Sequence, residues 1–222
     1  MKKILRTVLL VVLGIAIGAG AFWLLDGREK AVIGSYNYPG KVSSTDNAGN
    51  TECVLKNWQA VNLAYLTVSF LRLNDYVSLS TLVNPEFGLV LSPTPTVSLS
   101  SNQCFSAEQV AAFGSDITEY VWGVTNGSGE PIELTPSEYF ARYVYKQDYA
   151  FAKTIGVNQI VRSGNALENV PEVFPDAEFV DFYMPGETIG ETDSSWTILR
   201  LVFEENDGKL MLAAIIHSEY TA

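Results

Sequence analysis

The C-terminal stretch 196–217, WTILRLVFEENDGKLMLAAIIH, decides the fold class. It contains two runs in which apolar residues recur with a period of two, as in β-strands. Asn206-Asp207-Gly208 lies between the runs and is typical of a tight turn, so the stretch predicts an antiparallel hairpin. With a two-residue turn at Asp207-Gly208, Arg200 lies opposite Ile215, whereas a three-residue turn exchanges the partners.

The predicted hairpin has two unlike faces. With the two-residue turn, leucine, isoleucine and phenylalanine side chains fill one face, which must be covered by helices. The opposite face gathers Trp196, Arg200, Glu204 and His217. A three-residue turn instead moves His217 to the apolar face.

The sequence before the hairpin predicts helices. A long helix with a buried face is indicated by apolar residues at spacings of four and three: Val54, Trp58, Val61, Tyr65 and Val68. Capping boxes at Ser106 and Thr135 predict the starts of two further helices. Helices that precede a strongly paired antiparallel sheet favour the α+β class, with the helices packed on a curved sheet.

Residues 1–30 predict a membrane anchor. Thr7–Leu25 is a run of 19 residues without a charge, which spans roughly 28 Å as a helix and can cross a bilayer. Three cations precede the run with no acid among them, whereas the flank after it mixes both signs, so the positive-inside rule places the N-terminus in the cytoplasm. A cleaved signal peptide is the alternative, because Ala19-Gly20-Ala21 has the small-x-small pattern of a cleavage site. The domain is then secreted instead of anchored.

Residues 31–50 predict a flexible spacer, since they are rich in Gly, Ser, Asn and Tyr and show no period. Residues 51–222 then form an extracytoplasmic domain. Beyond residue 25 the chain has 11 basic residues, which is 14 minus the three before that point, against 25 acidic ones. The resulting charge of about −14 makes nucleic acid and anionic lipid headgroups poor partners.

The two cysteines and the single histidine restrict the chemistry of this chain. Cys53 and Cys104 are predicted to form a disulfide on the outer face of the membrane, with two free thiols as the alternative. His217 is the sole histidine, which excludes most tetrahedral zinc sites. No phosphate-binding glycine motif is present either, so we expect no metal and no cofactor.

The stretch from Trp58 to Tyr220 resembles a family of uncharacterised secreted or lipid-anchored bacterial proteins. Its most distinctive pieces are GSGEPI (127–132), Gly164-Asn165 and the closing hairpin. The resemblance implies a cystatin-like cone of the nuclear-transport-factor and ketosteroid-isomerase type, and it implies no activity. This chain has other residues at positions where histidine or aspartate is usual in the family: Asn84, Lys146, Gln147, Tyr183, Ser195 and Ser218.

One group of polar and aromatic residues is a candidate ligand site on the polar face of the sheet: Asp181, Tyr183, Trp196, Arg200 and His217. Folds of this shape often hold an apolar ligand between sheet and helices. The leading prediction is a non-enzymatic binding domain with an unknown protein or small-molecule partner. The alternative is a hydrophobic-ligand binder or a proton-transfer enzyme, in which Asp181 acts as the base and Tyr183 as the oxyanion donor.

Overall fold

The computed structural model describes residues 51–125, 128–189 and 192–220, and it describes no side chains for residues 51–56 and 187–194. The predicted anchor (1–30) and spacer (31–50) lie outside these ranges. None of the helices within the described ranges combines the length and the apolar character that a bilayer crossing requires.

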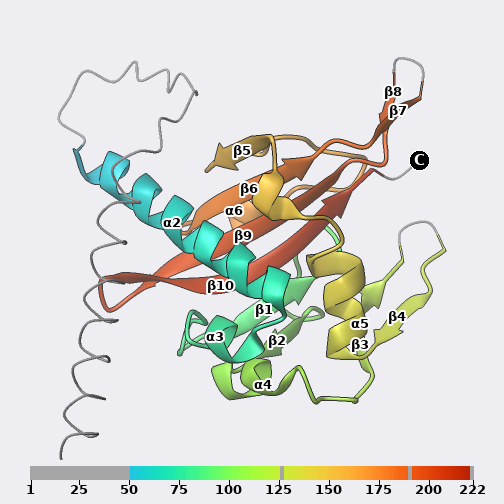
Figure 1. Ribbon diagram of the computed structural model, residues 1–222, viewed down its shortest axis with the longest axis horizontal. Helices are drawn as coiled ribbons and strands as arrows, with labels where there is room; N and C mark the ends of the chain where they lie inside the picture. The colour runs from blue at the N-terminus through green and yellow to red at the C-terminus, as the bar shows by residue number, and fades with distance from the viewer. Residues whose placement is uncertain (1–50, 126–127, 190–191, 221–222) are drawn as a thin grey trace, which may run out of the picture. The chain divides into compact units, whose positions relative to one another are not determined.

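Six strands of the described chain form one curved sheet (Figure 1). In sequence they are β1 (Leu89–Ser92), β2 (Gln103–Phe105), β5 (Thr154–Val157), β6 (Glu178–Met184), β9 (Thr197–Asn206) and β10 (Lys209–Glu219). In space their order is β2-β1-β10-β9-β6-β5. The α+β class is therefore confirmed. The prediction of a wholly antiparallel sheet is wrong at one place, because β1 runs parallel to β10.

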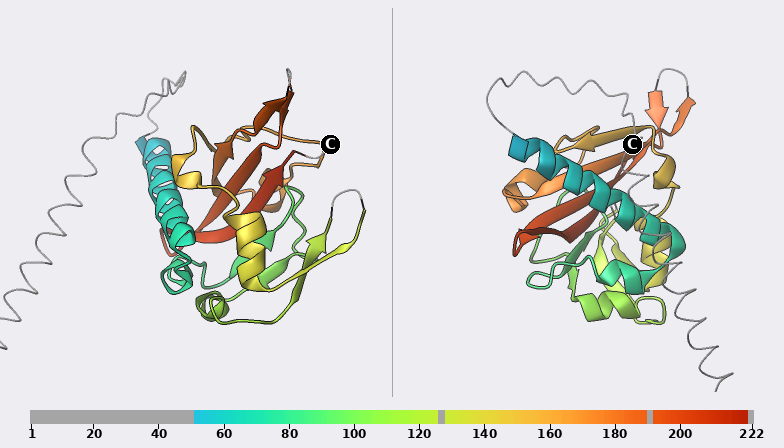
Figure 2. Two further views of the ribbon diagram at one scale, coloured as in Figure 1. Left: turned by 45° about the vertical axis from the view of Figure 1, so that its right-hand side comes forward. Right: turned by 60° about the vertical axis from the view of Figure 1, so that its left-hand side comes forward.

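Two small hairpins stand apart from the sheet. They are formed by β3 (Tyr120–Val124) with β4 (Pro131–Leu134) and by β7 (Glu187–Ile189) with β8 (Thr192–Ser194). Figure 2 shows both hairpins extending away from the central strands. Trp122 of β3 is fully buried and stacks on Tyr139 at 3.8 Å between ring centroids, which fixes the first hairpin to the core.

All helices except α6 gather on one face of the sheet, and α2 lies diagonally across it (Figure 1). The helices are α2 (Thr51–Leu73), α3 (Tyr76–Ser80), α4 (Ala107–Ala112), α5 (Pro136–Tyr139), the π-helix η1 (Phe140–Val144), the 3₁₀-helix η2 (Tyr149–Phe151) and α6 (Val170–Val173). The capping boxes predicted at Ser106 and Thr135 are both confirmed. In each box the cap side chain accepts from the backbone N–H three residues later.

Helix α2 packs through small residues. Its buried positions are Ala60, Ala64, Thr67, Val68 and Leu71, each at most 2% exposed. The buried face of α2 is therefore rotated about the helix axis relative to the predicted one. Trp58, which was predicted to be buried, is 50% exposed. The alanines let the helix backbone approach the sheet closely, and the large side chains of Trp58, Leu66 and Leu73 turn outward.

The hairpin turn has the predicted length. Asn206 pairs with Lys209, and Asp207 and Gly208 both have positive φ, at 49° and 76°, as a type I′ turn requires. Within β10, however, the register shifts between Leu212 and Ala214. This β-bulge leaves Ala213 without a partner and reverses the faces of all residues beyond it.

The bulge overturns the predicted pairing of the strand ends. Arg200 lies opposite Ile216, and His217 lies opposite Leu199. Leu199 belongs to the core beneath the helices, so His217 faces the helical side of the sheet, and Arg200 faces the other side.

The second face of the sheet is also covered. A separate apolar cluster there joins strand residues to the loop before β6, and its buried members are Val90, Val97, Val170, Phe174, Phe179, Val202, Ala214 and Ile216. The side chain of Asn169 holds this loop in place, because it accepts from Val97 N–H (2.8 Å) and donates to Val97 C=O (2.9 Å). Residues 158–177 therefore form a cover over the face that the sequence indicates as polar.

Candidate functional site

Arg200 and Asp181 form a fully buried ion pair beneath this cover. They lie opposite each other on β9 and β6, and neither is exposed to solvent. Nε of Arg200 donates to Oδ1 of Asp181 (2.6 Å), and Nη2 donates to Oδ2 (2.8 Å). This two-point geometry is the strongest arrangement available to an arginine and a carboxylate.

The cover supplies further partners to the pair. Nη1 of Arg200 donates to Oε2 of Glu168, and the backbone N–H of Val161 donates to Oδ2 of Asp181 (3.2 Å). Ser218 Oγ donates to the other oxygen of Glu168 at 3.5 Å. Both oxygens of Asp181 are thus occupied by donors from the protein itself.

Burial and ion pairing act in opposite directions on the pKa values of this pair. Burial raises the pKa of Asp181 above its ordinary value, because the opposing effect of the hydrogen bonds and charge of Arg200 is smaller. Burial lowers the pKa of Arg200, but Asp181 and Glu168 outweigh this effect and raise it above the ordinary value. Because a charged guanidinium bonds both of its oxygens, we take Asp181 to be ionised. It joins β6 to β9 and to the cover.

Tyr183 and Trp196 lie on the same face of the sheet and share Arg162 from the cover. Nη1 of Arg162 donates to the Tyr183 hydroxyl (3.1 Å), and its guanidinium carbon lies 5.4 Å from the centre of the Trp196 ring. Trp196 is buried at 1% exposure, and Tyr183 is half-buried. The structure thus brings four of the five candidate residues to one face and packs them against the protein.

His217, the fifth candidate residue, lies on the other face, and its placement with the other four is wrong because the bulge at Ala213 reverses the strand. It is 2% exposed and meets the Tyr143 ring of η1 edge-on, with 5.6 Å between centroids. Its Nε2 lies 3.3 Å from Oε2 of Glu219. The same oxygen accepts from Nζ of Lys146 at 2.7 Å. His217, Glu219 and Lys146 thus join the end of β10 to the residues that follow η1.

The environment of Glu219 makes it a stronger acid than usual. His217 lowers the pKa of Glu219, burial opposes this, and Lys146 lowers it further, to about 2 from an ordinary 4.5. A lowered folded-state pKa contributes stability that is present above the unfolded value and is lost as the pH falls through the folded value.

Acidification from about pH 4.5 to about pH 2 is therefore expected to remove a part of the stability that Glu219 supplies. The part is about 1 kcal/mol, because this side chain is 35% exposed and its charge is screened. Acid unfolding followed by circular dichroism measures it, with Glu219→Gln as the comparison. The variant should be less stable at pH 7 and should lose less on acidification. Parallel curves for the two proteins would contradict this prediction.

The predicted disulfide stays a prediction. Cys104 carries a free thiol in β2 that donates to the Phe87 carbonyl at 3.0 Å, and burial raises its pKa. The side chain of Cys53 lies outside the described residues. Among the residues that the structure describes, no group of three or more His, Cys, Asp or Glu side chains has the arrangement of a metal site.

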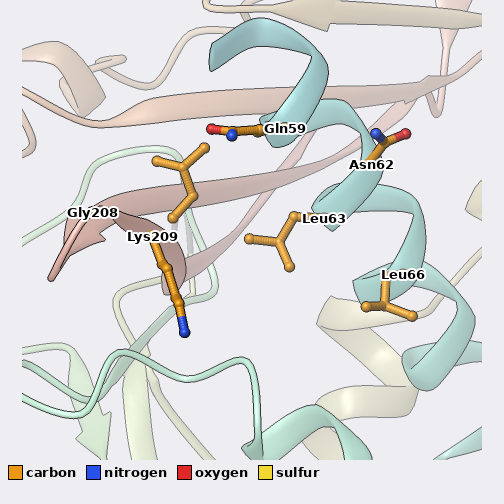
Figure 3. A pocket seen from close by; sticks show the side chains of 7 residues that line it. Gln59, Asn62, Leu63, Leu66, Gly208 and Lys209 are labelled. Atoms are coloured by element: carbon orange, nitrogen blue, oxygen red, sulfur yellow. The ribbon is translucent and has the colours of Figure 1, made fainter. Parts of the chain in front are cut away.

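An open groove lies between α2 and the turn of the β9–β10 hairpin, with a volume of about 390 Å³. Its lining residues are Gln59, Asn62, Leu63, Leu66, Gly208, Lys209 and Leu210. Figure 3 shows Gln59, Asn62, Leu63 and Leu66 on α2, with the Leu63 side chain directed towards the hairpin, and Lys209 on the hairpin. The lining offers leucine side chains, two amides and one cation.

The sequence reasoning missed several of these contributors. Glu168 and Val161 lie in an irregular segment without periodicity, and the groove joins residues roughly 150 positions apart in sequence. One available signal was Arg200 itself, since a buried arginine requires carboxylate partners from elsewhere in the chain.

Comparisons with known proteins add no relative: no protein-family model matches this chain, and no curated protein matches it significantly.

Proposed function

We propose that this chain is a membrane-anchored extracytoplasmic binding domain with a cystatin-like cone and no catalytic activity. Residues 1–30 anchor it with the N-terminus in the cytoplasm. Residues 31–50 act as a spacer, and residues 51–222 contact a partner at the cell surface.

The groove beside α2 is the observation that carries this proposal. It is open to solvent and has the mixed apolar and amide lining that suits contact with another molecule. The buried cluster of Asp181 and Arg200 supports the non-enzymatic part, because the oxygens that a catalytic base needs are bonded to Arg200 and Val161. A proton-transfer role for Asp181 has no supporting observation.

The membrane anchor and the extracytoplasmic placement are tested with the full-length chain carrying a C-terminal tag. After cell fractionation, the chain should remain in the membrane pellet through alkaline carbonate washing. Protease added to spheroplasts should remove the tag, and a cytoplasmic control protein should survive. A full-length chain in the soluble cytoplasmic fraction would overturn the anchor and the extracytoplasmic placement together.

The binding role is tested by photo-crosslinking in the same cells. A benzoylphenylalanine replacing Asn62 at the groove should form a discrete adduct on irradiation. The matched control is the same group at Ile117, which is 88% exposed and lies away from the groove. Adducts of equal yield at both positions, or at neither, would overturn the proposal that this surface binds a partner.

A further inference from the structure

From position 57 to the end of α2, the stripe of residues opposite the sheet carries no charge, and the one charged residue of this part, Arg72, lies beside the stripe and pairs with Asp148 at 3.2 Å. The exposed residues of the stripe are Trp58, Gln59, Asn62, Leu66, Ser69 and Leu73. The three apolar members are large and well exposed, at 50% for Trp58, 42% for Leu66 and 73% for Leu73. In the left view of Figure 2, α2 lies at the margin of the described domain and contacts the sheet on one side only.

An uncharged outer face is unexpected on a strongly acidic protein. A surface helix usually places charged residues opposite its buried face. Here the buried and exposed sides of α2 both carry apolar residues, although the chain beyond residue 25 has a net charge of about −14. Apolar patches of this kind mark interaction surfaces.

We infer that this face binds the same face of a second copy of the chain, so that two anchored molecules associate through α2. The inference rests on the proposed function, since it names the partner of that same surface. Two domains that each carry about −14 repel one another wherever charged surfaces approach. The uncharged stripe of α2 is a place where two copies can meet at low electrostatic cost.

The spacing of the apolar residues suits a partner helix. Leu66 follows Trp58 by eight positions, and Leu73 follows Leu66 by seven, which is close to the heptad repeat of paired helices. Leu66 lies at the middle of the stripe. In a two-fold pair centred there, it meets its own counterpart whether the helices run parallel or antiparallel.

The groove and the amides make the face complementary to itself. Gln59 and Asn62 each carry a donor and an acceptor, so the same amides on two copies can bond each other. The groove beside Leu66 provides space for a side chain of the second copy. Anchoring in one membrane raises the effective concentration of the two copies, so a modest affinity is sufficient.

The test uses two full-length copies with different tags, produced in the same cells, with the photo-reactive group at position 62 of one copy. The expected adduct has twice the 24.3 kDa monomer mass and contains both tags. An adduct with a different protein, or with lipid alone, overturns the second copy as partner and leaves a binding surface in place. No adduct at all overturns both this inference and the proposed function.

Charge variants of Leu66 test the geometry. Leu66→Glu in both copies should reduce the two-tag adduct at least tenfold, because like charges would meet at the centre of the contact. Leu66→Glu in one copy and Leu66→Lys in the other should restore it. The matched control, Leu167→Glu, changes a leucine that is 67% exposed and lies in the loop before β6. It should leave the adduct unchanged, and an undiminished adduct in the Leu66→Glu pair would overturn the inference.

Discussion

Replacing Arg200 with methionine is expected to lower the free energy of unfolding by about 3–5 kcal/mol. The substitution removes the cation that three hydrogen bonds hold between Asp181 and Glu168. Asp181 is fully buried, and the Glu168 side chain is only 8% exposed, so their charges would lose their partner away from water. Urea denaturation of the purified protein, followed by tryptophan fluorescence, measures the change.

The control removes the whole charged cluster. Arg200→Met combined with Asp181→Leu and Glu168→Leu should be clearly more stable than Arg200→Met alone, because no unpaired charge stays buried. This comparison separates the cost of an orphaned carboxylate from the loss of arginine packing. A loss below about 1 kcal/mol for the single variant would contradict the description of a dry, closed cluster.

Deletion of Ala213 is expected to leave every later residue of β10 on its present face. Ala213 has no partner on β9, whereas Leu212 and Ala214 already pair with the adjacent residues Phe203 and Val202. Removing the extra residue therefore gives a regular ladder in which Ile215 and His217 stay in the helix-covered core. The expected loss is about 1–3 kcal/mol, from the buried methyl group and the altered fit of β10 against β1. Soluble yield and near-ultraviolet circular dichroism measure the outcome.

Ala213→Gly is the matched control for that deletion. It keeps the chain length and therefore the bulge, so the expected loss is only about 1 kcal/mol from the greater freedom of glycine. A deletion variant that fails to fold, beside a folded Ala213→Gly, would show that β10 needs the bulge to fit against β1.

The candidate site has a structural role. The residues that bond its polar side chains lie in a different part of the sequence. Asp181, Tyr183, Trp196 and Arg200 do share a face, as their strand periodicity indicates. The cover formed by residues 158–177 supplies Val161, Arg162 and Glu168, which occupy the polar atoms that a ligand would otherwise contact. The outer side of α2, by contrast, is open to solvent.

The sequence alone determined the features that depend on neighbouring residues. The two-residue turn at Asp207-Gly208 follows from residues that tolerate positive φ. The caps at Ser106 and Thr135 follow from side chains within one helical turn of the N–H groups they bond. The α+β class follows from the change of apolar period along the chain, which is also a local property.

Only the tertiary structure decided the features that depend on distant residues. The bulge at Ala213 satisfies the packing of β10 between β9 and the parallel strand β1, and no local pattern marks it. The partners of Arg200 come from a loop without periodicity. The inner face of α2 was set by how closely alanines approach the sheet, since a helix with apolar residues all round can pack on either side.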